Sequence, residues 1–464
     1  MSTTIATHIL VFPYPAHGHM PALLDLTHQL ALRGLKITIL VTPKNLPSLT
    51  PLLSTHPTSI ETLVLPFPLH PRLLSGVENV KDIGNSGNAP IISSLSKLKD
   101  QVITWFRSHP FPPQAIISDF FLGFTQYWAT QLNIPRLAFF SVSSFLTCIL
   151  KHLWENLETR KENCDVVKFL ELPRTPCLKI DQLPSIYRKF KEGDPDWEAV
   201  KESLVMNSKS WGYVYNSFYA LEGEFLDHIP KILGHGRVYT IGPLSTIKRV
   251  NPDSDTTYAL FNWLDTCPDD SVVYVCFGSQ KQLTEPQIKA LASGLAQSKI
   301  RFIWVIKLIN GEQIPNGFEE QVSDRGIVIR GWAPQVEILT HKAVGGFVNH
   351  CGWNSILESV MAGVMLLVWP MEADQFVNAK IVVEFTGIAV KLCEGEYTIP
   401  DSDKLAQTIK ESFGHDIPQK VKAKEIREKA LEAMKPGRRS WVRIDELVED
   451  LKQIKYTKYE MEQC

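Results

Sequence analysis

Two histidines on either side of a glycine, His17-Gly18-His19, follow the apolar run His8-Ile-Leu-Val-Phe12 near the start of the chain. The carboxylate of Asp119 ends another apolar run in the same half of the chain. If both runs are strands of one parallel sheet, their carboxyl ends converge at one edge and bring a histidine close to the aspartate. An imidazole accepts a proton near neutral pH, and a carboxylate behind it orients the ring and stabilises the imidazolium. The pattern predicts acid–base chemistry at this edge.

The second half of the chain contains a turn suited to binding an anion. The run Gly346-Phe-Val-Asn-His350 is typical of a strand, and Cys351-Gly352-Trp353-Asn354-Ser355 then opens a helix that carries Glu358. N–H groups at a helix N-terminus attract negative charge, and a glycine lets a ligand approach the backbone. We expect Asn354 and Ser355 to cap the helix and to donate to the anion, with His350 as a further donor. An ordinary capped turn explains the glycine and Ser355 alone, but not the whole combination.

The anion is not held by either of the common phosphate-binding motifs. The sequence contains no G-x-x-x-x-G-K-[ST] motif and no G-x-G-x-x-G motif after the first predicted strand. The turn there reads Pro13-Tyr-Pro-Ala-His-Gly-His-Met-Pro21, which is too rich in proline to wrap around a pyrophosphate. We therefore expect the second half to bind a diphosphate and the first half to bind something else.

Short apolar runs alternate with longer amphipathic stretches along the chain, which indicates parallel sheets covered by helices on both faces. The predicted strands are 8–12, 36–41, 60–65, 115–118, 136–140, 213–216, 272–277, 302–306, 327–330, 346–348 and 365–369, and the predicted helices include 20–32, 285–296 and 355–362. The tail 419–455 has a helical period that is broken at Pro436-Gly437. The fold class is α/β, with two doubly wound Rossmann-like domains facing each other across a cleft. Ligands of such folds bind at the carboxyl ends of the strands.

The polar, proline-containing segment 246–257 is expected to link the two domains. The predicted division is an N-terminal Rossmann-like domain (1–245), the linker (246–257), a C-terminal Rossmann-like domain that carries the predicted diphosphate site (258–440) and a last helix (441–464) that packs back on the first domain. We expect a monomer.

Composition excludes several classes of function. The chain has 464 residues with 44% hydrophobic and 21% charged residues, and 48 basic side chains against 50 acidic ones give a formal net charge of -2. A nucleic-acid binder or a polybasic membrane anchor would need an excess of Lys and Arg. The eight cysteines form no C-x-x-C pair, so we expect free thiols in a reducing compartment. We find no secretory signal and no apolar stretch of the ~18 residues that span a membrane, and we expect a cytoplasmic protein with no stable membrane insertion.

A long block in the second half is similar to the signature box of plant family 1 glycosyltransferases, which use UDP-sugars to modify small secondary metabolites. The block runs from Trp332-Ala-Pro-Gln-Val-Glu-Ile-Leu through His350-Cys-Gly-Trp-Asn-Ser-Ile-Leu-Glu358 to Trp369-Pro-Met-Glu-Ala-Asp-Gln375, which is 44 residues. The N-terminal Pro-x-Pro-Ala-x-Gly-His, the Ile-Ser-Asp-Phe-Phe at 117–121 and the Phe-Gly-Ser at 277–279 also match. The resemblance therefore covers the whole chain and implies the GT-B type of fold. The segment 77–82 resembles the branch that acts on flavonols and hydroxybenzoic acids.

Carried over to this sequence, the resemblance implies a set of residues that bind the donor. Trp332 would stack on uracil while Ala333 and Gln335 fix its edge, and Glu358 would accept from the ribose hydroxyls. The diphosphate would be held by His350, Asn354, Ser355 and Ser279 beside Gly352. The sugar hydroxyls would be bound by Trp353, Asp374 and Gln375. No metal and no other cofactor is then required, because His350 and the helix dipole stabilise the leaving UDP.

The resemblance also implies the reaction, which is an inverting transfer of glucose to a hydroxyl of a phenolic acceptor such as a flavonoid or hydroxybenzoate. It places the base at His19 and the base's partner at Asp119, because a phenol with a pKa near ~10 attacks poorly until its proton is removed. His17 stands where the family usually has Gln, so we treat it as a neighbour of the acceptor pocket.

Several alternatives stay open. The donor sugar could be xylose, rhamnose or arabinose, since Val368 replaces a residue that is often small or hydroxylated beside the sugar, although Gln375 favours glucose. The product could also be a C-glycoside of an electron-rich phenol. A different class of function is a UDP-sugar sensor without catalysis, against which His19 and Asp119 argue, because binding alone needs neither.

Two weaker signals are expected to have structural explanations. Asp-x-Asp triplets hold Mn²⁺ in another class of glycosyltransferase, but the three found here are typical of turns, the linker and a helix cap: 194–196, 253–255 and 401–403. Five aromatic residues are candidates for the acceptor pocket, with core packing as the alternative for each: Phe120, Phe121, Phe145, Trp154 and Tyr187.

Overall fold

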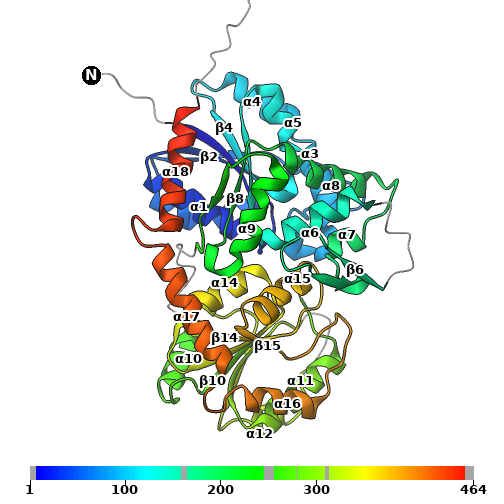
Figure 1. Cartoon of the computed structure of the whole chain (residues 1–464), viewed down its shortest axis with the longest axis vertical. Helices are drawn as coiled ribbons and strands as arrows, with labels where there is room; N and C mark the ends of the chain where they lie inside the picture. Colours follow the sequence, from blue (N-terminus) through cyan, green and yellow to red (C-terminus); the bar gives the residue numbers. More distant parts are fainter. Residues whose placement is uncertain (1–6, 158–164, 245–254, 279–280, 309–312, 455–464) are drawn as a thin grey trace, which may run out of the picture.

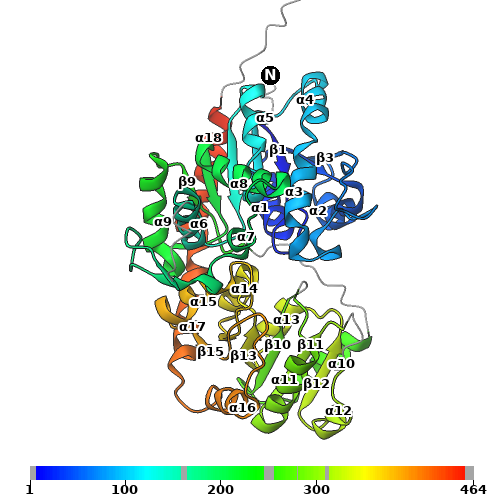
Figure 2. The ribbon, with the colours of Figure 1, turned by 90° about the vertical axis from the view of Figure 1, so that its right-hand side faces the viewer.

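Two parallel β-sheets, one in each half of the chain, form the centres of two lobes stacked end to end (Figures 1 and 2). The structure is a computed structural model that describes residues 7–157, 165–244, 255–278, 281–308 and 313–454. Its two doubly wound α/β lobes confirm the predicted fold class.

The first lobe contains a seven-stranded sheet in the order β3-β2-β1-β4-β5-β8-β9, in which every neighbouring pair is parallel. Its strands are β1 (His8–Phe12), β2 (Lys36–Val41), β3 (Ile60–Val64), β4 (Ala115–Asp119), β5 (Arg136–Phe140), β8 (Gly212–Tyr215) and β9 (Val238–Thr240). Its helices are α1 (Met20–Leu32), α2 (Thr50–Thr55), α3 (Asn88–Ser96), α4 (Lys99–Ser108), α5 (Thr125–Leu132), α6 (Ser144–Glu155), α7 (Ser185–Arg188), α8 (Pro195–Met206) and α9 (Tyr219–Leu233). A small antiparallel hairpin pairs β6 (Val166–Lys168) with β7 (Cys177–Lys179).

The second lobe contains a six-stranded parallel sheet in the order β12-β11-β10-β13-β14-β15. Its strands are β10 (Val272–Cys276), β11 (Arg301–Ile306), β12 (Gly326–Arg330), β13 (Val344–Asn349), β14 (Met365–Val368) and β15 (Ala389–Lys391). Its helices are α10 (Asp255–Asp265), α11 (Glu285–Ser298), α12 (Phe318–Gln321), α13 (Gln335–Thr340), α14 (Trp353–Ala362), α15 (Gln375–Lys380), α16 (Ser402–Glu411) and α17 (Pro418–Ala433).

The same reversal of strand order occurs in both sheets. The chain builds outward from β1 through β2 to β3 and then returns to place β4 on the other side of β1; in the second lobe β10 and β13 are related in the same way. Such a switch point opens a crevice at the carboxyl ends of its two strands, because the connections on either side leave in opposite directions. The crevices are where the fold positions functional side chains.

The last helix, α18 (Arg439–Gln453), lies against the first lobe, beside α1 and β9 (Figure 1, red). Arg33, which directly follows α1, donates to Asp445 at 2.7 Å and its guanidinium lies over the Trp441 ring, while Ser440 donates to the carbonyl of Gly242. The apolar side of α18 completes the first core with Ile444 and its neighbours.

Sequence patterns predicted the strands of four or more residues but missed the shortest strands, and they named only a few of the helices. The strand β9, the strand β15 and the hairpin β6–β7 have three residues per strand, which is too short to show a period. The predicted linker 246–257 lies outside the described residues except for its last three, and there α10 already begins at Asp255. Within the described ranges, no helix is long and apolar enough to cross a membrane.

Candidate active site between the lobes

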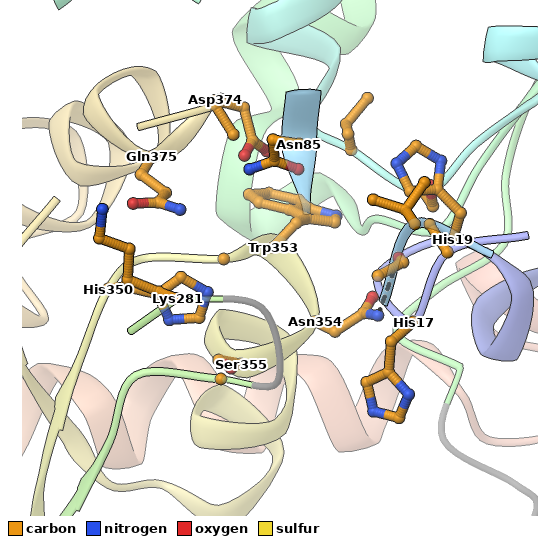
Figure 3. Close-up of a pocket in the computed structure, with 18 of the residues that line it drawn as sticks. His17, His19, Asn85, Lys281, His350, Trp353, Asn354, Ser355, Asp374 and Gln375 are labelled. Atoms are coloured by element: carbon orange, nitrogen blue, oxygen red, sulfur yellow. Dashed lines mark hydrogen bonds between the residues drawn. The ribbon is translucent and has the colours of Figure 1, made fainter. Parts of the chain in front are cut away.

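A cavity of about 800 Å³ lies between the two lobes, at the carboxyl ends of both sheets. The sequence-predicted residues that line it are His17, His19, Trp332, Ala333, Gln335, His350, Gly352, Trp353, Asn354, Ser355, Glu358, Asp374 and Gln375. Asp119 lies behind His19 rather than in the wall, and Ser279 is outside the described residues. In Figure 3, His17 and His19 lie on one side of the cavity and His350 and Gln375 on the other.

His19 and Asp119 form the contact that the first sequence pattern predicts. The ring nitrogen Nδ1 of His19 lies 3.1 Å and 3.0 Å from the two carboxylate oxygens of Asp119, whose side chain is fully buried. In the neutral ring, Nδ1–H donates to the carboxylate and Nε2 keeps its lone pair. His19 caps α1, and the turn before it is closed by N–H bonds of His19 and Met20 to the carbonyl of Ala16.

Aromatic rings fix the plane of the His19 ring. Phe120 stacks on it with ring centroids 5.5 Å apart and Phe121 lies at 4.7 Å. Tyr14 contacts it edge-on at 5.2 Å and donates its own hydroxyl to Asn88 at 2.7 Å. Burial raises the pKa of Tyr14 well above its ordinary value, so the hydroxyl stays protonated. With one nitrogen on Asp119 and three aromatic rings packed against it, His19 has little freedom to turn.

The turn after β13 leaves a buried imidazole without a partner. His350 Nδ1 has no hydrogen-bond partner among the described residues. The ring is pressed between two glycines, since a Cβ added to Gly278 or Gly352 would lie 2.7 Å or 2.8 Å from it. Gly278 also has φ of +76°, a conformation that side chains disfavour. The two glycines therefore make room for the ring and for a ligand beside it.

The His350 ring is neutral at physiological pH. Burial, with a smaller contribution from the charge of Lys281, lowers the pKa of His350 to about 4. A neutral imidazole offers one N–H donor and no charge. Lys281 lines the same cavity and pairs with Glu396 at 3.2 Å. Lys281 belongs to no motif of its own, and its place just after the Phe-Gly-Ser run is the only signal of it in the sequence.

The helix N-terminus differs in detail from the prediction. Gly352, not Asn354 or Ser355, is the N-cap of α14, so those two residues lie in its first turn. The expectation that they cap the helix was wrong because the extended φ and ψ fall at the glycine. Asn354 instead donates to the carbonyl of Gly18 at 3.0 Å, and the indole N–H of Trp353 donates to the carbonyl of Asn216 at 3.0 Å. Both bonds join the two lobes. The side-chain donors of Trp353 and Asn354, which the sequence alone would assign to a ligand, are therefore already used in bonds between the lobes.

Trp332 presents an exposed indole face beside a polar network. The residue is 59% exposed although it lines the cavity, which is unusual for so large an apolar ring. Next to it, Gln335 Nε2 donates to Glu358 at 2.7 Å, and Gln335 Oε1 accepts from the hydroxyl of Tyr274 at 3.3 Å. An aromatic face next to a carboxylate suits a flat ring that carries hydroxyl groups.

Asp374 and Gln375 form the far wall, and buried hydrogen bonds hold both. Gln375 Oε1 accepts from the N–H groups of Met371 and Glu372, which leaves its amide NH₂ as a donor. Asn378 is fully buried and donates to Asp374 Oδ2 at 2.7 Å. Burial raises the pKa of Asp374, and its hydrogen bond with Asn378 and the charge of His19 partly offset the rise. The far wall thus faces His19.

Sequence reasoning missed most of the acceptor side of the cavity. Phe120 and Phe121 line it as predicted, whereas Phe145, Trp154 and Tyr187 are buried in the core and do not. Further lining comes from residues on loops and helix ends that carry no motif: Val80, Asn85, Asn88, Val142, Leu146, Leu150, Ser185 and Ile186.

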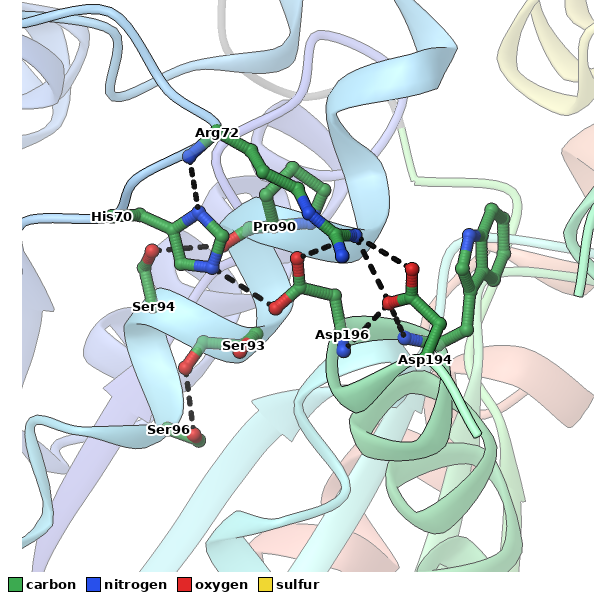
Figure 4. Close-up of polar contacts among 9 residues, drawn as sticks. His70, Arg72, Pro90, Ser93, Ser94, Ser96, Asp194 and Asp196 are labelled. Atoms are coloured by element: carbon green, nitrogen blue, oxygen red, sulfur yellow. Dashed lines mark hydrogen bonds and ion pairs between the residues drawn. The ribbon is translucent and has the colours of Figure 1, made fainter. Parts of the chain in front are cut away.

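The Asp-x-Asp triplets that the structure describes belong to helix starts. Asp194 caps α8 and pairs with Arg72, and Asp196 pairs with His70 at 2.9 Å (Figure 4). Asp401 caps α16 through the N–H groups of Asp403 and Lys404. The triplet 253–255 lies outside the described side chains. No group of three His, Cys, Asp or Glu side chains in the described ranges is placed to hold a metal ion.

Comparison with known proteins identifies the family. Residues 245–416 match the family model described as UDP-glucoronosyl and UDP-glucosyl transferase. UDP-glycosyltransferase 89A2 of Arabidopsis thaliana is 49% identical over 452 residues, which cover 96% of each chain. The chain belongs to the plant UDP-glycosyltransferases. A second relative, the flavonol 3-O-glucosyltransferase UGT89B1 of Arabidopsis thaliana, is 48% identical to this UDP-glycosyltransferase over 92% of each chain.

Solved structures agree with the GT-B fold of this UDP-glycosyltransferase. Arabidopsis thaliana UGT89C1 complexed with UDP-L-rhamnose has a TM-score of 0.81 and 38% identity, and the match covers 97% of this chain and 100% of that chain. Glycyrrhiza uralensis UGT73P12 complexed with glycyrrhetinic acid 3-O-monoglucuronide has a TM-score of 0.84 and 29% identity, covering 97% and 96%. The chain is therefore an enzyme of the UDP-glycosyltransferase class.

Proposed function

We propose that this UDP-glycosyltransferase transfers glucose from UDP-glucose to a hydroxyl of a phenolic acceptor, a flavonoid or a hydroxybenzoate, with inversion at the anomeric carbon. The observation that carries the proposal is the His19–Asp119 contact, which leaves His19 Nε2 available in the cavity that His350 and Trp332 also line. Flavonols are included among the proposed acceptors because one relative is named as a flavonol 3-O-glucosyltransferase and the structure of another contains quercetin.

The donor would bind along the second lobe. Uracil would stack on the exposed indole of Trp332, and the ribose hydroxyls would donate to Glu358. The diphosphate would receive the N–H groups at the start of α14 and a ring N–H of His350, which lines the cavity. Ser279, Asn354 and Ser355 remain predicted contacts. Neutral donors suit an anion that must depart as UDP, because a fixed countercharge would bind product as tightly as the transition state.

The sugar would lie between the two lobes, against Asp374 and the free amide NH₂ of Gln375. The indole N–H of Trp353 is already donated to Asn216, so Trp353 would meet the sugar through its main chain or its ring face. A phenol placed against Phe120 and Phe121 would bring its hydroxyl to His19.

The reaction is a single displacement. The phenolic oxygen forms a bond to the anomeric carbon while the bond from that carbon to the β-phosphate oxygen breaks, and its electron pair leaves with UDP. His19 Nε2 takes the phenolic proton, and Asp119 stabilises the imidazolium that results. Attack from the side opposite the leaving group inverts the centre. We propose that no metal takes part, so the rate is expected to be unchanged in EDTA, and an absolute need for Mn²⁺ would contradict this part.

Rhamnose is a second candidate donor, favoured by the relative named flavonol 7-O-rhamnosyltransferase and by the structure that contains UDP-L-rhamnose. Competition among UDP-glucose, UDP-rhamnose, UDP-xylose and UDP-arabinose decides the sugar. Acid stability of the product separates C- from O-glycosides. A monomeric state, a cytoplasmic location and the predicted domain limits stay predictions.

The test of the base is His19→Ala, with His17→Ala as the matched control two residues away. We expect His19→Ala to lower the rate of glycoside formation by about 10²–10⁴-fold and to leave the Kd for UDP, measured by calorimetry, within about twofold, because the base contacts the acceptor and not the nucleotide. His17→Ala should keep most of the activity. A His19→Ala enzyme that releases UDP at the native rate in the presence of phenol would refute the proposal.

A further inference from the structure

An arginine is buried directly behind the His19–Asp119 pair. Arg136 is the first residue of β5, its side chain is fully buried, and its guanidinium is surrounded by neutral oxygens. These acceptors and their distances are Ser118 Oγ at 2.9 Å, Thr125 Oγ1 at 2.8 Å, Asn207 Oδ1 at 3.0 Å, Ser210 Oγ at 2.6 Å and the main-chain oxygen of Asp119 at 3.4 Å. Among the described residues, no carboxylate lies within ion-pairing distance of Arg136.

Burying a cation without an adjacent counterion costs folding free energy, so we expect the charge of Arg136 to serve a function. Burial lowers the pKa of Arg136 to about 9, and the charges of Tyr213 and Asp119 partly offset the effect, so the guanidinium stays charged at neutral pH. Burial also raises the pKa of Tyr213, which keeps that phenol neutral. Of these two groups, Asp119 is the one that carries a negative charge for Arg136 to act on.

We propose that Arg136 is a positioning residue whose charge keeps the His19–Asp119 pair free of an extra proton at neutral pH. The inference rests on the proposed function, in which His19 must be unprotonated to accept the proton of the phenol. The Asp119 carboxylate is fully buried and the His19 side chain, which packs against Phe120 and Phe121, is only 16% exposed. A positive charge behind them opposes the binding of a further proton.

The other titratable groups around the pair do not replace this charge. Tyr14 packs on His19 and stays protonated because burial raises its pKa. Asp374 faces His19 from the second lobe, and an acidic group there favours protonation of the imidazole. Arg136 acts from the opposite side and has the opposite sign. The His19–Asp119 pair thus lies between a carboxyl group in the cavity wall and a cation in the core.

The hydrogen bonds of Arg136 also give it a geometric role that must be separated from the electrostatic one. They join β4, through Ser118, to the start of α5, through Thr125, and so span the turn that carries Asp119. Loss of the side chain would disturb this turn even if the charge had no effect. The experiment therefore needs one variant that removes the charge, one that cancels it in place and two that keep it.

Arg136→Met removes the charge. Asn207→Asp introduces a carboxylate of almost the same shape 3.0 Å from the guanidinium and cancels the charge without removing the arginine. Arg136→Lys keeps the charge but loses the forked hydrogen bonds, and Ser210→Ala removes one hydrogen bond only. The pKa of His19 is measured by NMR of the ¹³C-histidine-labelled protein, with His19→Gln used to assign the signal, alongside the pH dependence of kcat.

We expect Arg136→Met and Asn207→Asp to raise the pKa of His19 and the acid limb of kcat by about 0.5–1 pH unit. The rate at pH 6 then falls severalfold more than the rate at pH 8.5. Arg136→Lys and Ser210→Ala should leave both values near those of the native protein, whatever their effect on maximal rate. If Arg136→Met does not fold, Asn207→Asp decides the question alone.

An unchanged His19 pKa in Asn207→Asp, or equal shifts in all four variants, would overturn the electrostatic role. This failure is distinguishable from failure of the proposed function, because the NMR titration requires no turnover. An inactive His19→Ala enzyme together with no NMR shift overturns the role of Arg136 alone, whereas an active His19→Ala enzyme overturns the function itself.

Discussion

Each lobe presents a histidine at the switch point of its own sheet, after the first strand of the lobe in one case (β1) and after the fourth in the other (β13), and the two histidines have opposite electrostatic surroundings. His19 follows β1 and faces the end of β4, while His350 follows β13 beside the end of β10, so each lies at the switch point of its own sheet. Both carboxylate oxygens of Asp119 contact His19 Nδ1, whereas His350 has no carboxylate partner among the described residues and has a pKa of about 4. The two histidines therefore differ in charge environment as well as in the strand that they follow.

The difference shows that the partner of a side chain, more than its place in the fold, decides its chemistry. A carboxylate behind an imidazole lets the ring gain a proton, which suits the side of the cavity that must activate an acceptor. Burial without a carboxylate keeps the other ring neutral, which suits a group that donates one hydrogen bond to a diphosphate. The same residue type therefore supports proton transfer in one lobe and anion binding in the other.

The largest effect on this difference between the two histidines is expected in the Asp119→Asn variant. The amide removes the charge that stabilises the imidazolium and lets Nδ1 become an acceptor, so the proton moves to Nε2 and blocks the base. We expect kcat to fall by about 10²–10³-fold, with donor Kd unchanged, measured by steady-state kinetics and calorimetry. The control is Glu61→Gln, a carboxylate near His8 and His109 at the opposite end of the strands, which should leave kcat within about twofold. Equal losses in the two variants would contradict the role of Asp119.

In the second lobe, the His350→Ala variant removes the side chain that is proposed to bind the diphosphate. Loss of one buried donor should weaken UDP-glucose binding by about 5–30-fold, measured by calorimetry without acceptor. The pH dependence sharpens the comparison, because a group whose pKa is lowered to about 4 stays neutral at every higher pH. Donor affinity should therefore be constant from pH 5.5 to 8, while turnover falls on the acid side as His19 becomes protonated. A donor affinity that fell together with kcat at acid pH would contradict the proposed difference between the two histidines.

A smaller effect is expected where the lobes are joined. Asn378 donates to Asp374 and to the carbonyl of Cys351, and accepts from Ser143 of the first lobe at 3.3 Å. In Asn378→Ala the carboxylate of Asp374 loses its orienting bond, so the KM for UDP-glucose should rise by about 3–10-fold and selectivity among UDP-sugars should fall. Ser143→Ala, which removes the longest of these bonds together with the side-chain cap of α6, is the control. Unchanged sugar selectivity in Asn378→Ala would contradict the proposal that the hydrogen bond from Asn378 orients Asp374 toward the sugar.

The smallest effect is expected at the edge of the acceptor side. His70 and Arg72 fasten a loop of the first lobe to the start of α8 through Asp196 and Asp194 (Figure 4). The same connection between β3 and α3 carries Val80 and Asn85 in the cavity wall. His70→Ala should raise the acceptor KM about 2–5-fold and leave the donor KM unchanged. Arg174→Ala, which breaks an exposed pair with Glu224, is the control. A rise in donor KM instead would place this loop elsewhere in the reaction.

Sequence patterns predicted the architecture because buried parallel strands appear as continuous apolar runs, as in β1, β2 and β5. They also predicted that Asp119 and His19 meet, since switch-point geometry brings the end of one strand next to the turn after its neighbour, whereas Trp332, Asp374 and Gln375 were expected at the cavity from the family resemblance. Local patterns did not show that Gly352 is the helix cap, because that depends on backbone angles. They also did not show that the indole N–H of Trp353 donates to the first lobe, because that partner is distant in the chain.

Arg136 illustrates what a sequence cannot show. It begins a strand whose other residues are apolar, where an arginine is usually a surface side chain. Its partners lie as far away as Asn207 and Ser210 in the chain, so only the folded structure reveals that the guanidinium is buried behind Asp119. The acceptor wall is similar, because its loops carry no period and no motif.

The most direct test is a crystal structure with a phenolic acceptor and an unreactive fluorinated analogue of UDP-glucose. We expect uracil against the indole of Trp332, the diphosphate beside His350 at the start of α14, and the phenolic oxygen within hydrogen-bond distance of His19 Nε2 on the opposite side of the anomeric carbon. A nucleotide bound away from Trp332, or a phenol whose hydroxyl points away from His19, would contradict the division of labour between the two lobes.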